Sequence, residues 1–324
     1  MKRVVGLMAI LSVLVCTGAV GAAADFPAKG KSISMILGTS AGGSTDVGAR
    51  ILAAAMEKDL AGTATRIQVE NKPGAGWQIG LTALARSRPD GYTIGFTILP
   101  QTITNYLDPE RKAVFERKSF QPLGMQVVDP GVIAVNASSP YKTLKDLADA
   151  AKAAPSKIKA SATGILSDDH LAILQFQRLT GTKFAIVQFD GSAKAMTALL
   201  GGHTDVYFGN VGDTFPQAKA GEVRVLGVMD DDENKFLPGK TTFSQGIKLE
   251  SSSSRGLSAP AGTPKEIVDF LAAAIKKAIA NDEHSKKMED QGLTVRYMDP
   301  ARMEKYWAEM EEQIKPLMSI AKEK

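Results

Sequence analysis

The chain has 324 residues, of which 44% are hydrophobic and 23% charged, and its 39 basic and 35 acidic residues give a net charge of +4. These proportions are typical of a soluble globular protein, and the length suits two domains of ordinary size. No run of Lys and Arg stands out, so we expect no nucleic-acid partner.

The N-terminus has the pattern of a cleavable signal peptide. Two basic residues precede an apolar stretch, residues 4–15, which is shorter than the roughly 20 residues that a membrane-spanning helix needs. Residues 22–24 are Ala-Ala-Ala and fit an Ala-x-Ala cleavage site. Cys16 is the only cysteine, and Val15 precedes it where a lipoprotein signal has a small residue, so a lipid anchor is disfavoured. We therefore expect residues 1–24 to be removed and the mature protein to lie in the periplasm.

Strand-like and helix-like segments alternate along most of the mature chain. Short apolar runs of strand length recur, and stretches with apolar residues at helical spacing lie between most of them. Three of the helices are expected to begin at the N-caps Thr143, Ser167 and Ser192. This alternation predicts parallel sheets covered by helices. The predicted strands are residues 32–37, 66–70, 93–98, 131–135, 159–162, 184–189, 205–209 and 223–229.

The C-terminal region departs from the alternation. Residues 230–256 are rich in Asp, Ser, Lys and Gly, and we expect them to form a long surface connection. Thr263, Pro264 and Glu266 have the spacing of a capping box at the start of a helix. A last helix is predicted to start at Asp299.

Four turns between a predicted strand and the next helix are rich in small or polar residues. In a parallel α/β sheet such turns lie at the carboxyl ends of the strands, where ligands usually bind. Free backbone N–H groups and the positive end of a helix dipole make such a turn an anion site. Two domains whose turns face each other would enclose a cleft suited to a carboxylate. The turns are residues 38–46, 71–76, 163–170 and 190–192.

Two acidic residues beside these turns, Asp46 and Asp190, have two interpretations each. The carboxylate either caps or orients its turn, or it meets an ammonium or hydroxyl group of the ligand. If Asp190 faces the cleft, it repels a second carboxylate on the ligand and favours a monocarboxylate, including hydroxy and amino acids. We expect no metal or other cofactor, because the mature chain lacks cysteine and its three histidines are scattered. The candidate ligand-binding residues are Thr39, Ser40, Gly42, Gly43, Asp46, Thr163, Gly164, Ser167, His170, Phe189 and Asp190.

An enzymatic alternative comes from residues 38–42, which match the Gly-x-Ser-x-Gly elbow of α/β-hydrolases with Ser40 as nucleophile. The elbow here follows the first strand of the mature chain, whereas the hydrolase elbow follows several strands. A catalytic triad also needs a histidine downstream, and His170, His203 and His284 are the only candidates. A secreted hydrolase therefore stays as the alternative to a binding protein.

Several motifs, in the same order, resemble the periplasmic solute receptors of tripartite tricarboxylate transporters, often called Bug proteins. The family's Pro-Gly-Gly-x-x-Asp turn is similar to residues 41–46, with Ala41 in place of the proline. Its Asn-Arg-Pro-Gly-Ala-Gly turn is similar to residues 71–76. Further motifs match at residues 89–93, 198–205 and 259–264.

The resemblance implies an α/β architecture, the type II periplasmic-binding-protein fold, with two lobes around a ligand cleft. We expect a discontinuous first lobe of residues 25–126 and 255–324 and a second lobe of residues 127–254. Family members hold a carboxylate through main-chain groups and ordered water at the first turn and at the turn matching residues 163–170. The usual Tyr-Lys-Gly of the fourth turn is Phe-Asp-Gly here, at residues 189–191, which disfavours a tricarboxylate such as citrate.

The same resemblance implies the partners. We expect a monomeric receptor, not an enzyme, that delivers a small carboxylate ligand to integral membrane permease subunits. A receptor that feeds a sensor kinase remains open, because either partner would recognise the closed form of the receptor.

We predict that the mature protein begins near Asp25, because the leader has a basic start, an apolar centre and an Ala-x-Ala end. Intact-mass analysis of the periplasmic fraction measures this N-terminus. A mass that includes Cys16 and acyl chains would show a lipid-anchored protein instead.

Overall fold

The computed structural model describes residues 26–320, so the predicted leader and its cleavage site lie outside the described residues. The strands are β1 (Ile33–Leu37), β2 (Ile67–Asn71), β3 (Thr93–Leu99), β4 (Phe120–Asn136), β5 (Lys159–Ala162), β6 (Ala185–Gln188), β7 (Val206–Asn210), β8 (Val223–Met229), β9 (Ser252–Pro260) and β10 (Val295–Met298). The α-helices are α1 (Ser44–Asp59), α2 (Gln78–Ala85), α3 (Gln101–Leu107), α4 (Leu144–Ala153), α5 (Asp168–Thr180), α6 (Ser192–Leu200), α7 (Val211–Lys219), α8 (Lys265–Ile279), α9 (Asp282–Asp290) and α10 (Pro300–Ile320).

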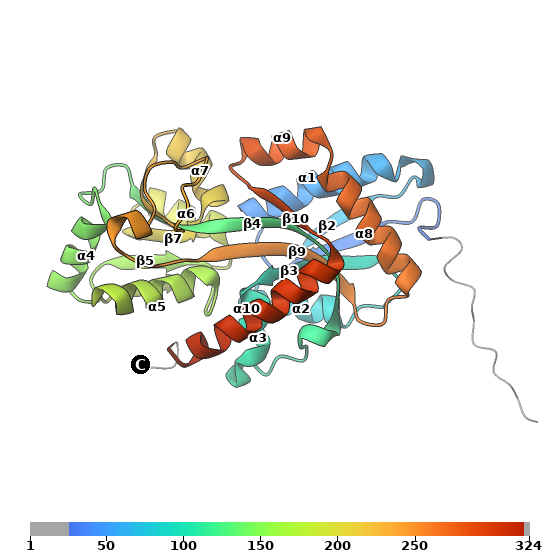
Figure 1. Cartoon of the computed structure of the whole chain (residues 1–324), viewed down its shortest axis with the longest axis horizontal. Helices are drawn as coiled ribbons and strands as arrows, with labels where there is room; N and C mark the ends of the chain where they lie inside the picture. The colour runs from blue at the N-terminus through green and yellow to red at the C-terminus, as the bar shows by residue number, and fades with distance from the viewer. Residues whose placement is uncertain (1–25, 321–324) are drawn as a thin grey trace, which may run out of the picture.

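The chain forms two lobes, which Figure 1 shows side by side. Lobe 1 contains β1 to β3 with α1 to α3 and α8 to α10, and lobe 2 contains β5 to β8 with α4 to α7. The long strands β4 and β9 extend from one lobe into the other (Figure 1). Within residues 26–320, no helix is both long and apolar enough to cross a membrane.

One sheet connects the lobes, in the strand order β2-β1-β3-β9-β4-β7-β5-β6, with β8 and β10 also paired to β4. The prediction of parallel sheets is right for β1 with β2 and β3, and for β5 with β6 and β7. It is wrong for the pairs that β4 and β9 make, which are antiparallel. The reason is topological: β4 carries the chain from lobe 1 to lobe 2 and β9 brings it back. Because both strands are continuous through the junction, the expected lobe boundaries stay a prediction.

Part of this frame was not apparent in the sequence. All eight predicted strands are present, but β4 begins eleven residues before the predicted start at Gly131, at Phe120. Residues 252–256, expected to be surface connection, form the first half of β9, and Ser253, Ser254 and Arg255 are buried there. These side chains are polar, so they lack the apolar pattern of a buried strand; their burial is made possible by hydrogen bonds, such as that between Ser254 and the Tyr306 hydroxyl at 2.8 Å.

The helix starts test the capping predictions. Thr143 and Ser167 are confirmed as N-caps, because the Thr143 hydroxyl accepts the Asp146 N–H and the Ser167 hydroxyl accepts the His170 N–H, each at 3.1 Å. The capping box at Thr263 is wrong. Its hydroxyl donates to the Pro260 carbonyl at 2.8 Å, so it stabilises the preceding turn, and α8 begins only at Lys265.

Each lobe has its own hydrophobic core, and the last helix completes that of lobe 1. Trp307 of α10 is fully buried and stacks on Phe120 with a ring separation of 6.0 Å. Its indole N–H donates to the Tyr106 hydroxyl at 3.2 Å. The C-terminal helix is therefore part of lobe 1, although the chain has passed through lobe 2 before reaching it.

We predict that Trp307→Ala lowers the free energy of unfolding by about 3–5 kcal/mol, because it leaves a cavity against Phe120 in the lobe 1 core. Urea denaturation followed by circular dichroism measures the change. Leu179→Ala is the control: this side chain is 53% exposed, so its loss should cost less than about 0.5 kcal/mol. Equal effects of the two substitutions would contradict the packing described.

Candidate ligand-binding site

The first predicted turn, between β1 and α1, is held in shape by Asp46. The Asp46 carboxylate accepts the Gly42 N–H at 3.0 Å and two N–H groups of Arg50 at 2.9 and 3.0 Å. Asn71, from the second predicted turn, donates to it at 3.0 Å. Burial raises the pKa of Asp46, but these hydrogen bonds outweigh it and hold the pKa below its ordinary value. Asp46 therefore orients the turn, and its oxygens are already occupied.

The turn between β5 and α5 is also fixed by its own side chains. Ser167 caps α5, and the Thr163 hydroxyl donates to Asp169. The Gly164 N–H donates to the Gln188 side chain at 3.1 Å. His170 accepts the Leu166 N–H on Nδ1 at 3.0 Å, and burial, with a smaller contribution from a nearby arginine, lowers its pKa to about 4. The imidazole is thus neutral near pH 7 and serves the turn.

The fourth predicted turn, between β6 and α6, contacts the first turn across the lobes. The Asp190 carbonyl accepts the Ser40 N–H at 3.4 Å and lies 3.5 Å from the Thr39 hydroxyl. The Asp190 carboxylate points elsewhere: it is 57% exposed and lies 3.6 Å from the Lys194 ammonium. Gly191, and not the predicted Ser192, is the N-cap of α6, so the prediction of Ser192 as an N-cap is wrong. The charge expected in the cleft is therefore outside it in this closed arrangement, and the main chain of Asp190 makes the contact instead.

Where these turns meet, the two lobes enclose a cavity of about 30 Å³, which is room for about two water molecules. Lobe 1 also touches lobe 2 beside it, where the Thr104 hydroxyl donates to the Leu166 carbonyl at 2.8 Å. The lobes are thus closed on each other. The cavity is lined by Thr39, Thr45, Trp77, Ile98, Gln101, Thr163, Asp168, Gly191, Ser192, Asn210, Asp213, Ser253 and Arg255.

The cavity brings together only part of the predicted set. Thr39 and Thr163 line it, while Ser40 and Gly43 contact the opposite lobe beside it. Phe189 packs against the small apolar cluster around Tyr207 in lobe 2. The remaining predicted residues shape the turns and do not line the cavity: Gly42, Asp46, Gly164, Ser167, His170 and Asp190. Their roles in ligand binding stay a prediction.

Several charged or amide side chains in the wall were missed. Asn210 and Asp213 lie one and four residues beyond the predicted strand 205–209, so the rule that selected the other turns would also have selected this one. The sequence did not indicate Arg255 as a site residue, because the segment that contains it was predicted to be a surface connection. Asp168 lies within the predicted turn 163–170, but it is not among the predicted site residues.

Asp213 links the two lobes directly at the cavity. Its Oδ1 accepts the Ser44 N–H, the first of α1, at 2.8 Å. This N–H belongs to the helix N-terminus where the sequence led us to expect a ligand carboxylate. In the closed structure that donor is therefore occupied by a carboxylate from the protein's own α7.

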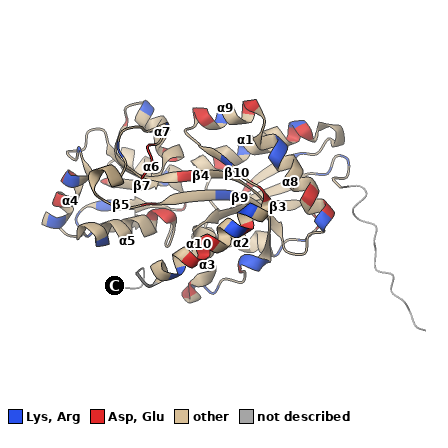
Figure 2. Cartoon of the chain, in the orientation of Figure 1, with Lys and Arg blue, Asp and Glu red and all other residues tan. Residues whose placement is uncertain are grey.

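A buried ion pair lies behind the cavity, at the junction of the lobes. Arg255 of β9 donates to Asp129 of β4 at 2.7 Å, and both side chains are buried (Figure 2, blue in β9 and red in β4). Burial raises the pKa of Asp129 to about 7, against the opposing effect of Arg255. Burial likewise raises the pKa of Asp168, whose carboxylate accepts an N–H of Asn210 at 2.9 Å. One guanidinium nitrogen of Arg255, Nη1, is buried without a hydrogen-bond partner among the described residues.

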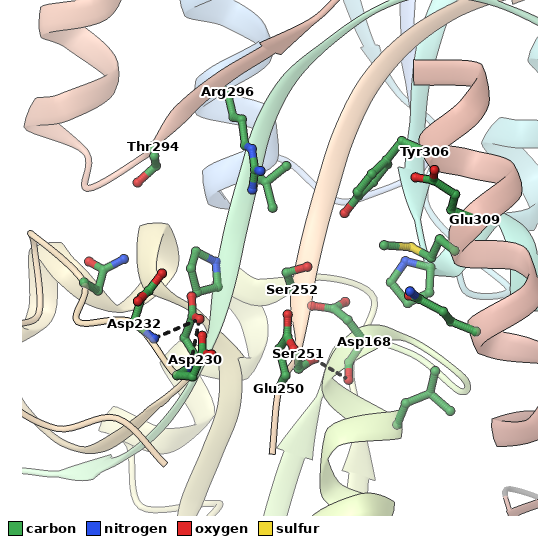
Figure 3. Close-up of a pocket in the computed structure, with 18 of the residues that line it drawn as sticks. Asp168, Asp230, Asp232, Glu250, Ser251, Ser252, Thr294, Arg296, Tyr306 and Glu309 are labelled. Carbon is green, nitrogen blue, oxygen red and sulfur yellow. Dashed lines mark hydrogen bonds between the residues drawn. The ribbon is translucent and has the colours of Figure 1, made fainter. Parts of the chain in front are cut away.

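A second hollow, of about 850 Å³, lies beside α10 and the crossing strands, and we call it the hinge groove (Figure 3). Its labelled side chains are mostly charged, and Asp168 contributes to both the groove and the cavity. Among residues 26–320, no group of three or more His, Cys, Asp or Glu side chains is arranged to hold a metal. We favour the smaller cavity as the ligand site, because the predicted turns meet there and not at the groove.

Ser40 lacks the surroundings of a catalytic nucleophile. Its Oγ is buried and has no hydrogen-bond partner within residues 26–320. An activated serine needs an adjacent base, and the imidazole of His170 is engaged with Leu166. The Gly-x-Ser-x-Gly match therefore reflects a turn of small residues.

Comparisons with known proteins extend these observations. The profile of the family described as "Tripartite tricarboxylate transporter family receptor" matches residues 48–322. The "UPF0065 protein in gbd 5'region" of Cupriavidus necator is 30% identical over 309 residues, covering 90% of each chain. "Protein BugT" of Bordetella pertussis is 27% identical over 304 residues, covering 89% of each. The solved periplasmic binding protein BugD, at 28% identity and a TM-score of 0.80, covers 88% of this chain and 97% of that one. The two-lobed α/β fold is thus that of periplasmic binding proteins.

We predict that Gly43→Val weakens ligand binding at least about tenfold, or about 1.4 kcal/mol, because its branched side chain crowds the contact between the closed lobes. A Cβ at Gly43 would collide with the Ser192 hydroxyl of lobe 2. The Gly43 φ of −83° is one that any residue adopts, so the fold of lobe 1 should survive. Calorimetric titration measures the affinity. Gly62→Val is the matched control, since nothing lies within 4 Å of an added Cβ there; equal affinities for both variants would remove the first turn from the site.

Proposed function

Because this chain belongs to the tripartite tricarboxylate transporter receptor family, we propose that it is a periplasmic receptor for a small carboxylate-bearing solute. It captures the solute between its lobes and delivers it to integral membrane permease subunits of a tripartite tricarboxylate-type transporter. The receptor carries out no chemistry on the solute. Members of the family are solute-binding receptors, and the fold of this chain is theirs.

The observation that carries the proposal is the cavity between the closed lobes. Its wall includes the hydroxyls of Thr45 and Ser192, which make no hydrogen bond among residues 26–320 and can donate to a ligand. Arg255 adds a guanidinium nitrogen without a partner among the described residues. Such groups suit an oxygen-rich anion of small size.

The size of the cavity implies that the receptor opens to load. A space of about 30 Å³ is too small for an organic acid, which displaces several water molecules. The lobes must therefore separate, and β4 with β9 are the strands about which they move. Ligand then stabilises, by its contacts with both lobes, a form in which the lobes close around it and leave more space than in the present structure.

The two alternatives differ in what supports them. A hydrolase finds no support in the surroundings of Ser40, because no base is hydrogen-bonded to its Oγ among residues 26–320. A receptor that feeds a sensor kinase shares the binding step with our proposal and differs only in the partner that recognises the closed form.

We predict that a thermal-shift screen of mono-, di- and tricarboxylates, hydroxy acids and amino acids finds a stabilising ligand. A ligand present at 100 times its Kd should add about 2.7 kcal/mol to the free energy of unfolding. The Gly43→Val variant serves as the control, because its lobes should close less well on the same compound.

Two outcomes count against the proposal. If no carboxylate shifts the melting temperature, the binding function is wrong. If a carboxylate binds but its uptake by cells is the same with and without this protein, the transport role is wrong and the sensor alternative gains support.

A further inference from the structure

The carboxylate of Asp213 occupies a position where a ligand anion was expected. It accepts the Ser44 N–H of lobe 1 at 2.8 Å while projecting from α7 of lobe 2. The same side chain lines the cavity. A ligand carboxylate directed to the N-terminus of α1 would therefore lie beside the carboxylate of Asp213, and the two negative charges would repel each other.

The other titratable side chains around the cavity are also mostly acidic. Asp168 and Asp213 line it, and Asp129 and Asp169 lie close enough behind the wall for the charge of Asp213 to act on them. Arg255 is the one basic side chain in that wall, among the described residues. Part of its charge is already matched, because it donates to Asp129 at 2.7 Å. Burial and the neighbouring carboxyl groups raise the pKa of Asp129, Asp168 and Asp169, so their ionised forms are favoured by a cationic ligand group and disfavoured by an anionic one.

One hydrogen-bond donor in the wall, on Arg255, nevertheless favours an anionic ligand group. Nη1 of Arg255 is buried without a hydrogen-bond partner in residues 26–320, and the residue is only 2% exposed. A buried donor left unpaired is costly, so a ligand that supplies an acceptor is favoured. The wall therefore presents an unpaired cationic donor beside two carboxylates.

We propose that the ligand is an aminocarboxylate, a compound with both a cationic nitrogen and a carboxylate. Its nitrogen binds between Asp168 and Asp213, and its carboxylate binds Nη1 of Arg255. This inference rests on the proposed receptor function and narrows its substrate class.

The structure explains why Asp213 can serve both the protein and the ligand. A carboxylate has about four acceptor positions on its two oxygens, and the Ser44 N–H takes one of them. A ligand ammonium beside Asp213 would share the carboxylate with α1, so ligand binding and lobe closure strengthen each other. A ligand without a cationic group cannot make this contact with Asp213, and any further negative group that it carries is repelled by the carboxylate.

The experiment uses ligands matched in length and different only in one group. Calorimetric titration of the full mature chain compares alanine with lactate and methylmalonate, and 4-aminobutyrate with 4-hydroxybutyrate and glutarate. For the length that fits the cavity, we expect the amino acid to bind at least about tenfold more tightly than its hydroxy acid and dicarboxylate partners.

Asp213→Asn tests the residue itself. The amide oxygen can still accept the Ser44 N–H, so closure is retained while the charge is lost. We expect the amino acid to lose at least about tenfold in affinity and the dicarboxylate to gain. Asp190→Asn is the matched control: it removes the same charge from an exposed carboxylate near the cleft, and the ratio of affinities should not change.

The outcomes separate this inference from the proposed function. Tighter binding of the dicarboxylate or the hydroxy acid by the wild-type protein overturns the inference and leaves the receptor function standing. If a folded Asp213→Asn variant has the wild-type ratio of affinities for the amino acid and the dicarboxylate, the inference is also overturned and the receptor function stands. If the variant does not fold, the inference is tested by the affinities of the wild-type protein for the amino acid, the hydroxy acid and the dicarboxylate. If none of the carboxylates in this panel or the thermal-shift screen binds, the proposed function falls and the inference with it.

Discussion

The antiparallel pairing of β4 with β9 is the interaction on which the rest of this structure depends. These strands are the connections that carry the sheet from one lobe into the other (Figure 1). Where they cross, Arg255 and Asp129 form an ion pair that is buried on both sides. Removing one partner of such a pair leaves an uncompensated buried charge, which typically costs about 3–5 kcal/mol. The junction therefore has little freedom to change its register, and the turns of the two lobes face each other because of it.

The ion pair also joins the fold to the binding site. One end of the Arg255 guanidinium holds Asp129, and the other end lies unpaired at the cavity. A ligand acceptor at Nη1 would extend the hydrogen-bond network that already joins Arg255 of β9 to Asp129 of β4. This arrangement resembles a preorganised site, in which the protein holds a donor in place before the ligand arrives, so that little ordering is left to binding.

The acidic wall gives the site its selectivity in our proposal. Main-chain donors at helix N-termini attract any carboxylate, so they distinguish poorly between one acid and another. The carboxylates of Asp168 and Asp213 lie in the same wall and would repel a second negative group. Selection would then rest on what the ligand carries besides its carboxylate. The hinge groove, although larger, has no comparable meeting of turns from both lobes.

The sequence by itself determined the local elements and the family. The eight predicted strands, the caps at Thr143 and Ser167 and the glycine-rich first turn follow from neighbouring residues, and neighbouring residues are visible in one sequence. Only the tertiary structure decided how the turns are used. Asp190 was expected at the cleft but pairs with Lys194 outside it, whereas Asp213, four residues beyond a predicted strand, reaches α1. Arg255 lay in a segment too polar to predict as a buried strand, because its burial depends on Asp129, which is 126 residues away in the sequence. Pairings over such distances are fixed by the packing of the two lobes, and no local pattern records them.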